Sequence, residues 1–531
     1  MNESRWAKKD EIKSTTAKVN LNQTEYKTAG VPIISDGQTA YVDGEDTHTI
    51  VFGSTGSKKS RLFCMPMINM MIRAGESYVV TDPKGELYNK TAGSAQKNNY
   101  KVVVLNYRDI GKGDCWNPLE CPYDMYHSDN KELAISMLND FIASLSDMHR
   151  KTANDVFWIE TASSLALANL LTLMECGEKS EVHVGSFAAM CTNDNIEYLK
   201  LIAAKMNPDS IAGTNYNSVF SSAEKTLQSI QISLYAWLRI FVTQKKLTSM
   251  LSKCTFDARS IGRQKTAVYL IIPDEKTTYH FLATVFIKQV YETLISEAQK
   301  EATGMLPVRV NFVLDEFCNM PAIPDMASMI SAARSRNMRY YLIVQGMNQL
   351  KSKYQEDAET IKGNCENWIF LTSKELILLN EISELCGTIT MPNGVKRSLI
   401  SPSELQRLDK VKGEVLILHG RNYPFITELP DIDEYKMFTA SNAEDLKEVS
   451  VKYKIFSVIE LYKRLGKESI VLFDDNIDVS EDNQEKKESL SDRVEQAISE
   501  SGSKEGINLQ AELEKKFDEL FGDSNKKEDN Y

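Results

Sequence analysis

Residues 51–62 read VFGSTGSKKSRL and contain most of a phosphate-binding loop. Such a loop has the pattern Gly, four residues, then Gly-Lys-Ser or Gly-Lys-Thr. Its backbone N–H groups surround the phosphates, its lysine reaches them, and its hydroxyl is a ligand of Mg²⁺. Gly53, Lys59 and Ser60 fit the pattern, while Lys58 stands where the second glycine is usual. We predict that ATP is bound by this loop, namely by Gly53, Ser54, Thr55, Gly56, Ser57, Lys58, Lys59 and Ser60.

The loop can be aligned with the pattern in two registers. With Lys59 as the phosphate-binding lysine, three of the four defined positions are filled. With Lys58 in that role, Phe52 and Ser57 fall on the glycine positions and only the lysine fits. We therefore assign the role to Lys59. A side chain at position 58 crowds the turn or strains it by at most a few kcal/mol, which affects turnover more than binding.

The run VRVNFVLDEF at 308–317 has the pattern of a buried strand that ends in two carboxylates. In ATP motors the Asp at such a strand end holds the Mg²⁺ shell, and the following Glu polarises the attacking water. We predict that Asp315 and Ser60 contact Mg²⁺ and that Glu316 is catalytic. The alternative is a pair of solvated carboxylates at a strand terminus.

Two further polar features lie close by in the sequence. The run YYLIVQ ends in Gln345, which we predict to sense the γ-phosphate from a neighbouring strand; a surface amide is the alternative. Before it, MISAARSRNMR contains Arg334, Arg336 and Arg339. A ring motor needs one arginine in the ATP site of the neighbouring subunit, where it stabilises transition-state charge. A solvated basic helix end is the alternative for these arginines.

These residues require a sheet that brings strand ends together. Short, continuously apolar runs alternate with helical patterns, which is typical of a mostly parallel α/β sheet buried on both faces. The expected strands are 48–52, 77–82, 101–106, 266–274, 310–316, 339–345, 367–372 and 413–419. One central sheet is therefore predicted to be built from both ends of the chain.

Strand patterns vanish from about 180 to 250, where helical periodicity takes over. We predict a nucleotide-binding domain made of residues 1–178 and 257–436, with an all-helical domain at 179–256 inserted between its parts. Residues 437–531 are predicted to form an acidic, partly disordered extension. Within it, the apolar stripe at 509–521 is either a docking helix or a marginal solvated helix, and the acidic tail either docks a partner or is merely solvated.

Composition narrows the setting of the protein. The nine cysteines include no C-x-x-C pair, which indicates a reducing cytosol. We expect no membrane span, because the most apolar stretch, 163–176, is short and has the pattern of a core helix, and the N-terminus lacks the apolar core of a signal peptide. The net charge is −12, but residues 471–531 hold 18 acidic and 8 basic side chains. The acidic total therefore does not exclude nucleic acid as a partner.

Several longer stretches match a known family. They are SRWA (4–7), VVTDPKGELY (79–88), WNPL (116–119), FWIETASSL (157–165), LDEF (314–317), AARSRNM (332–338) and VQGMNQL (344–350). Over roughly residues 1–430 the chain resembles the type IV secretion coupling proteins, the TraG/TraD-type ATPases of conjugation. The resemblance implies a RecA-like P-loop ATPase that uses ATP and Mg²⁺. It also implies catalytic roles for Lys59, Asp315, Glu316 and Gln345, with Arg334 as the arginine finger.

The same resemblance implies the partners. The family forms hexameric rings that deliver relaxase-bound single-stranded DNA, or effector proteins, into a secretion channel. Most members begin with membrane helices just upstream of the segment that SRWA matches, so we expect a cytoplasmic chain that works at the cytoplasmic face of the membrane with a membrane-embedded partner. We expect a homo-hexamer when the protein is active and a monomer when the soluble chain is isolated. Asp82, Lys84 and Glu86 match a family motif at a strand end, with a pore-facing or nucleotide-edge role.

Two other functions remain open at this point. One is a non-hydrolysing, ATP-binding adaptor that recruits substrates, for which Lys58 is the motive. The other is a DNA translocase of the FtsK type, which the family-specific stretches and the lack of a recognisable winged-helix pattern in 437–531 disfavour.

Overall fold

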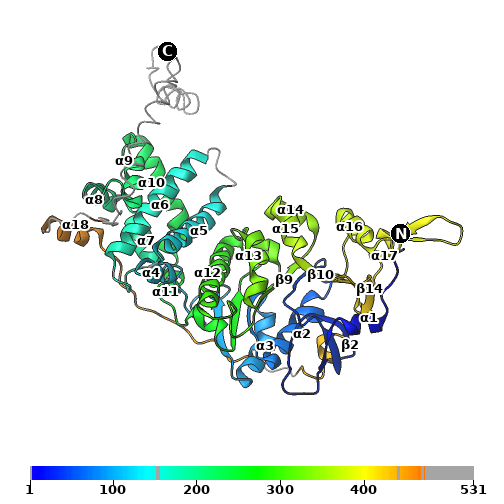
Figure 1. Cartoon of the computed structure of the whole chain (residues 1–531). Coiled ribbons are helices and arrows are strands. Elements are labelled where there is room, and N and C mark those ends of the chain that lie inside the picture. Colours follow the sequence, from blue (N-terminus) through cyan, green and yellow to red (C-terminus); the bar gives the residue numbers. More distant parts are fainter. Residues whose placement is uncertain (1–2, 129, 151–155, 439–442, 468–471, 473–531) are drawn as a thin grey trace, which may run out of the picture. The chain divides into compact units, whose positions relative to one another are not determined.

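The computed structural model describes residues 3–128, 130–150, 156–438, 443–467 and 472 (Figure 1). These residues belong to one compact unit, Met1–Phe473. Residues 473–531 of the predicted acidic extension, including the apolar stripe at 509–521, lie outside the described residues.

A nine-stranded, mostly parallel sheet forms the centre of this unit. The seven strands from β10 to β6 are parallel, and β13 and β14 are antiparallel additions at one edge. The predicted α/β sheet, built from both ends of the chain, is confirmed. Its order is β14 (Phe425–Glu428), β13 (Glu414–His419), β10 (Cys365–Phe370), β4 (His48–Phe52), β9 (Met338–Val344), β8 (Val310–Leu314), β5 (Ser77–Asp82), β7 (Thr266–Ile271) and β6 (Lys101–Asn106).

The inner strands explain the apolar runs of the sequence. Strands β4, β5, β7, β8 and β9 are buried at every position, so both of their faces need apolar side chains. All eight predicted strands form part of the sheet. Strand β14 is missing from the prediction because its four residues, FITE, alternate between buried and less buried positions and lack a continuous apolar run.

Helices cover both faces of the sheet (Figure 1). On one face, α2 (Met65–Ala74) and α3 (Glu86–Lys97) pack over side chains such as Tyr78 and Val80. On the other, α12 (His280–Lys300), α13 (Met326–Ala333) and α15 (Asp357–Gly363) pack over Val79 and Phe312. Because the inner strands are parallel, their carboxyl ends meet at one edge, which is where α/β folds bind ligands.

Smaller elements surround this sheet. The N-terminal segment forms α1 (Lys9–Ser14) and a separate antiparallel sheet of β1 (Ala17–Asn20), β3 (Thr39–Val42) and β2 (Pro32–Ser35). After β9 come α14 (Met347–Tyr354), α16 (Leu376–Cys386), the hairpin of β11 (Thr388–Thr390) and β12 (Lys396–Ser398), and α17 (Pro402–Leu405).

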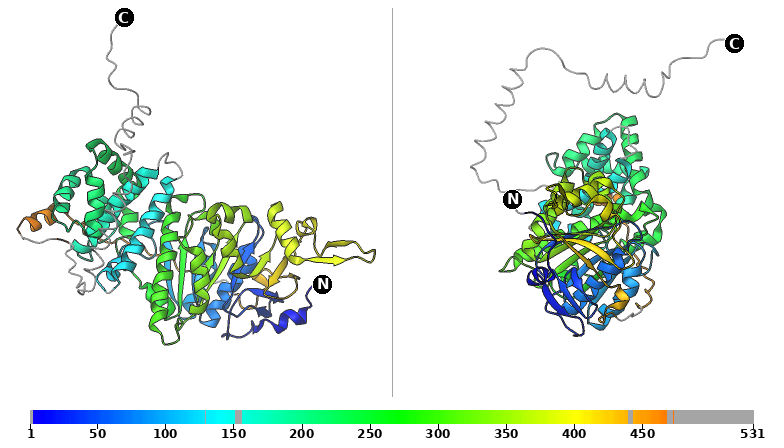
Figure 2. Two further views of the ribbon diagram at one scale, coloured as in Figure 1. Left: turned by 45° about the horizontal axis from the view of Figure 1, so that its top comes forward. Right: turned by 90° about the vertical axis from the view of Figure 1, so that its right-hand side faces the viewer.

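An all-helical bundle follows β6 (Figure 1, Figure 2). Helix α6 packs against α5, α9 and α10, and the hydroxyl of Tyr216 on α9 donates to the side chain of Asn169 on α6 (2.7 Å). The predicted boundary at residue 178 therefore lies between helices of the bundle, and the domain limits remain a prediction. The helices are α4 (Glu120–Tyr126), α5 (Lys131–Arg150), α6 (Val156–Cys176), α7 (Val184–Met190), α8 (Asn193–Ala203), α9 (Ile211–Phe220), α10 (Glu224–Thr243) and α11 (Lys245–Met250).

Helix α6 corrects the expectation that no stretch is long enough to span a membrane. It has 21 residues, and an 18-residue window of it has a mean hydropathy of 1.4, so by length and composition alone it could cross one. The helix begins at Val156, before the apolar core at 163–176, and its first two turns include polar residues such as Glu160 and Thr161. Of that window, 56% is buried inside the protein. One such helix is weak evidence, since the core helix of a soluble protein passes the same test.

The chain returns to the helical bundle after the sheet is complete. The ring of His183 contacts the carbonyl of Lys454 (2.9 Å), and Phe456 N–H donates to Ser186 Oγ (3.0 Å). Helix α18 (Val458–Lys467) then packs against α8, with Tyr462 against Tyr198. Of the predicted C-terminal extension, the part from Lys454 through α18 thus packs on the helical bundle, whereas Ala443 and Leu446 pack against the core under α2 and α3.

Candidate nucleotide-binding site

The predicted phosphate-binding loop lies at the carboxyl end of β4 and leads into η1 (Ser60–Cys64), a π-helical turn that continues as α2. Gly53 N–H donates to the carbonyl of Val344 on β9 (3.1 Å), and Ser54 N–H donates to the carbonyl of Thr372, just past β10 (3.0 Å). A Cβ on Gly53 would stand 2.5 Å from Ser57 Oγ. A side chain at position 53 would therefore displace Ser57 and Lys59 within the loop, and the loop is fixed to both neighbouring strands.

Lys58 adopts the backbone conformation that a glycine usually provides. Its φ is 66°, in the left-handed region that costs a residue with a Cβ about 1–2 kcal/mol. Its ammonium pairs with Asp431, with Nζ 3.5 Å from Oδ2. The loop thus makes its turn with a lysine in place of the second glycine.

Lys59 lies inside the loop with only 6% of its surface exposed. Its ammonium donates to the carbonyls of Gly53 (2.5 Å) and Ser54 (3.4 Å) and lies 3.7 Å from Glu316 Oε1. The two lysines therefore differ in direction, since Lys58 pairs with Asp431 outside the loop. This difference supports the register in which Lys59 is the phosphate-binding lysine.

Asp315 follows β8 directly and meets the start of η1. Ser60 Oγ donates to Asp315 Oδ2 (3.2 Å), although 255 residues separate the two in sequence. Burial and the charge of Glu316 raise the pKa of Asp315 to about 6, against the opposing charge of Lys59. The hydroxyl and the carboxylate fit Mg²⁺, which takes oxygen ligands and usually only one or two from protein, the rest being phosphates and water.

A second carboxylate lies at the end of the adjacent strand β5. Asp82 is 2% exposed, and its Oδ2 accepts the N–H of Tyr88 (2.8 Å). Burial raises the pKa of Asp82 to about 7, and the charge of Asp315 adds to the rise. The predicted strand-end motif consists of Asp82, Lys84 and Glu86. Asp82 therefore lies at the same edge of the sheet as Asp315, while Lys84 and Glu86 are exposed.

Glu316 is held by polar neighbours from two elements. Gln345 Nε2 donates to Glu316 Oε2 (2.7 Å), and Asn319 Nδ2 reaches the same oxygen at 3.4 Å. Glu316 has a φ of 52°, a left-handed conformation found at few non-glycine residues and often at functional sites. The structure therefore brings together five predicted residues, namely Lys59, Ser60, Asp315, Glu316 and Gln345.

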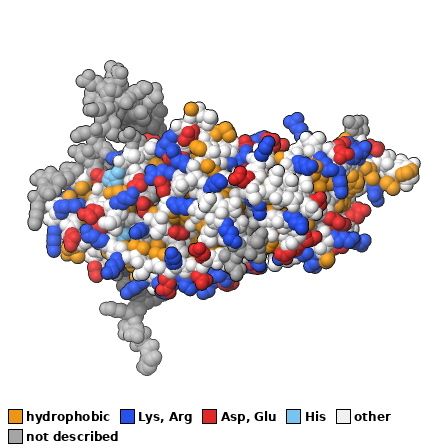
Figure 3. Space-filling model, turned by 90° about the horizontal axis from the view of Figure 1, so that it is seen from below, with side chains coloured by type: hydrophobic (Ala, Val, Ile, Leu, Met, Phe, Trp, Pro, Cys, Tyr) orange, Lys and Arg blue, Asp and Glu red, His pale blue; other side chains and the backbone are white. Residues whose placement is uncertain are grey.

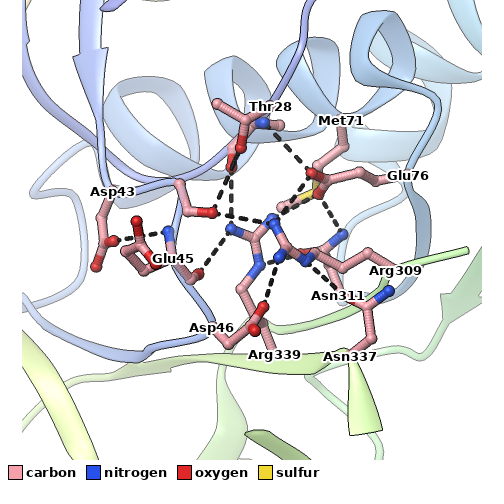
Figure 4. Close-up of polar contacts among 12 residues, drawn as sticks. Thr28, Asp43, Glu45, Asp46, Met71, Glu76, Arg309, Asn311, Asn337 and Arg339 are labelled. Carbon is pink, nitrogen blue, oxygen red and sulfur yellow. Dashed lines mark hydrogen bonds and ion pairs between the residues drawn. The ribbon is translucent and has the colours of Figure 1, made fainter. Parts of the chain in front are cut away.

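The three arginines have different surroundings. Arg334 is 60% exposed at its side chain, and Arg336 donates to Ala332 and Ser335 close to it in sequence. Arg339 is fully buried and pairs with Glu76, with further hydrogen bonds to Asn311 Oδ1 and the carbonyl of Ala29 (both 2.9 Å; Figure 4). Arg339 is therefore a buried residue of β9, held inside the protein, and is unable to reach another subunit. Arg334 and Arg336 remain as possible arginine fingers.

Several residues at the carboxyl edge of the sheet were not predicted from the sequence. Thr81 Oγ1 donates to the carbonyl of Asp315 (2.7 Å), and Asn319 contacts Glu316. Because Thr81 and Asn319 are close in sequence to Asp82 and Glu316, they could have been predicted to lie at the site. Arg61 and Asp431, which pair beside the loop, gave no such signal, since 370 residues separate them.

Comparisons with known proteins bear on this site. A family model described as "Type IV secretory system Conjugative DNA transfer" matches residues 5–398. The chain belongs to this family. It is 23% identical to the conjugal transfer protein TraG of Escherichia coli over 431 residues, which are 71% of this chain and 66% of the relative. It is 20% identical to the protein VirD4 of Rhizobium radiobacter over 410 residues, 71% of this chain and 56% of the relative.

Solved structures agree on the fold of this family member. The plasmid coupling protein TrwB in complex with a non-hydrolysable GTP analogue has a TM-score of 0.61 at 16% identity, covering 83% of this chain and 95% of TrwB. TrwB in complex with ADP and Mg²⁺ has a TM-score of 0.59 at 14% identity, covering 85% and 97%. The fold is thus the RecA-like P-loop fold of TrwB. The chain spans between about half and two thirds of the length of the curated relatives that it matches.

Proposed function

We propose that this chain is the ATP-driven coupling protein of a conjugative type IV secretion system. The observation that carries the proposal is the meeting of Lys59, Ser60, Asp315, Glu316 and Gln345 at one edge of the sheet. These residues come from three strand ends, and each has the side-chain type that phosphoryl transfer needs at its place.

The cofactors follow from the same site and from the structural relatives. TrwB is known in complex with ADP and Mg²⁺ and with a non-hydrolysable ATP analogue. We propose that ATP and Mg²⁺ bind here, with Ser60 and Asp315 on the ion. Bound Mg²⁺ supplies charge that offsets the charge developing on the phosphates.

Three other residues of this chain have separate proposed roles in hydrolysis. In this structure, the ammonium of Lys59 donates to two carbonyls of the loop. Charged phosphate oxygens are stronger acceptors than carbonyls, so Lys59 would donate to the phosphates of bound ATP instead. The amide of Gln345 orients the carboxylate of Glu316. This carboxylate would hold a water molecule in line for attack on the γ-phosphate and accept a proton from that water. Arg334, exposed at the end of α13, is proposed to reach the site of a neighbouring subunit in a homo-hexamer.

The proposed cargo is relaxase-bound single-stranded DNA or a protein effector, delivered at the cytoplasmic face of the membrane with other secretion components. On the face in Figure 3, Lys and Arg side chains are interspersed with Asp and Glu. That face of the described residues therefore lacks the extended basic surface that follows a nucleic-acid backbone. DNA is proposed to run through the pore of the assembled ring, held by phosphate contacts that weaken with salt.

Steady-state ATP hydrolysis by the full chain, with and without single-stranded DNA, tests the proposal. We expect turnover that DNA stimulates. The variant Glu316→Gln is expected to bind nucleotide and not hydrolyse it, because the amide cannot accept the proton, whereas Lys59→Ala is expected to lose binding as well. Turnover of the wild-type chain no higher than that of Glu316→Gln would overturn the motor and favour the non-hydrolysing adaptor.

A further inference from the structure

The backbone at Lys58 raises the question of what holds it in place. A φ of 66° is accessible to glycine without cost, but a residue with a Cβ tends to leave it. A loop that relaxed at position 58 would turn the N–H of Lys58, and with it the N–H of Lys59, away from the phosphates. Some contact must therefore oppose this relaxation.

Asp431 makes that contact from 373 residues further along the chain. One of its oxygens, Oδ2, pairs with Lys58 Nζ at 3.5 Å, and the other, Oδ1, accepts the Nε–H of Arg61 at 2.7 Å. A single carboxylate thus holds the two cations that flank Lys59 and Ser60. Burial acts to raise the pKa of Asp431, but Arg61 and Lys58 outweigh it and leave the pKa below its ordinary value, so the carboxylate is charged at neutral pH.

The segment that carries Asp431 is itself firmly placed. Residues 430–435 follow β14, and Ile432 and Tyr435 are buried in the core that also contains α2. The side chains of Asp431 and Glu434 cap the turn reciprocally, and Lys436 N–H donates to the carbonyl of Gly37 (2.9 Å). Asp431 therefore acts from a fixed point and not from a free loop.

We propose that Asp431 is a positioning residue of the nucleotide site, which holds the phosphate-binding loop in its turn by anchoring Lys58. The inference rests on the proposed nucleotide-binding function. In this proposal Asp431, which lies outside every sequence motif of the site, stabilises the turn that the second glycine usually provides. Asp433 serves as a natural comparison, because it pairs with Arg61 and, among the described residues, not with Lys58, and its side chain is 70% exposed.

The test uses the full chain and a fluorescent ATP analogue with Mg²⁺, titrated to equilibrium. Asp431→Asn is expected to weaken binding about threefold to fivefold, the effect of losing a partly exposed charge pair. The double variant Lys58→Gly with Asp431→Asn is expected to recover wild-type affinity, because glycine holds the left-handed conformation without an anchor. Asp433→Asn is expected to bind as the wild type does.

Hydrogen exchange of residues 53–62 without nucleotide gives a second readout. We expect faster exchange in Asp431→Asn and wild-type protection in the double variant. Unchanged or tighter binding in Asp431→Asn, or a failure of Lys58→Gly to restore either readout, would overturn the role of Asp431. If the wild type does not bind the analogue, the proposed function fails, and exchange in the loop still decides whether Asp431 positions it.

Discussion

The surroundings of the arginines predict opposite outcomes for two similar substitutions. Arg339 has no exposed surface, and its guanidinium is the partner of Glu76 in the network of Figure 4. Arg339→Gln leaves that carboxylate buried, with Arg309 at 3.6 Å as a remaining cation and with hydrogen bonds from Asn311 Nδ2 (3.0 Å) and Ala29 N–H (3.3 Å). Arg334→Gln, in contrast, removes one ion pair of 3.7 Å to Glu366 between two exposed side chains.

These contacts set the expected magnitudes. Breaking a buried ion pair by removing one partner costs about 3–5 kcal/mol, and the remaining charge of Arg309 places Arg339→Gln near the lower end, at about 3 kcal/mol. In a chain of 531 residues, with about 2.1 cal/mol/K of unfolding entropy per residue, that corresponds to a fall in Tm of about 3 °C. An exposed pair is worth less than about 1 kcal/mol, so Arg334→Gln is expected to lower Tm by about 1 °C or less.

Thermal unfolding followed by circular dichroism, with ATP hydrolysis measured on the same samples, separates the two roles. We expect Arg339→Gln to melt early, and Arg334→Gln to melt as the wild type does while losing hydrolysis under conditions where rings assemble. If Arg339→Gln melts within about 1 °C of the wild type, or if both variants melt equally early, then burial and pairing are the wrong guide to these arginines.

Three further predictions concern charges. Burial raises the pKa of Glu292 to about 7 despite Lys288, so this group stabilises the fold below about pH 4.5 and loses that contribution as pH rises through 7. Glu292→Gln should therefore raise Tm relative to the wild type at pH 8 and leave it unchanged at pH 4. Because the pKa of Asp315 is about 6 and Mg²⁺ needs its ionised form, affinity for the Mg²⁺–ATP analogue should fall up to about tenfold between pH 6 and 5, and Asp315→Asn should remove that dependence. Lys58→Gly should retain or raise hydrolysis; if Lys58→Ala proves as damaging as Lys59→Ala, the register is wrong.

The sequence by itself determined the parts of the site that depend on local pattern. Strands buried on both faces are mostly apolar, and β6, β10 and β13 are buried at most positions, so the eight predicted strands were visible as apolar runs. Polar residues placed directly after such runs, as Asp315 and Gln345 are, must lie at the carboxyl edge of a parallel sheet. The loop and its lysines were visible because its chemistry depends on adjacent residues.

Only the tertiary structure decided which distant groups meet. It separated Arg339, a buried structural ion-pair partner, from the exposed Arg334, although the two are five residues apart in one basic stretch. It packed α6 against α5, α9 and α10, which the helical pattern of the sequence does not reveal. It also placed Asp431 against Lys58. A pair that far apart in sequence leaves no periodicity to detect, because its contact depends on how the whole sheet folds.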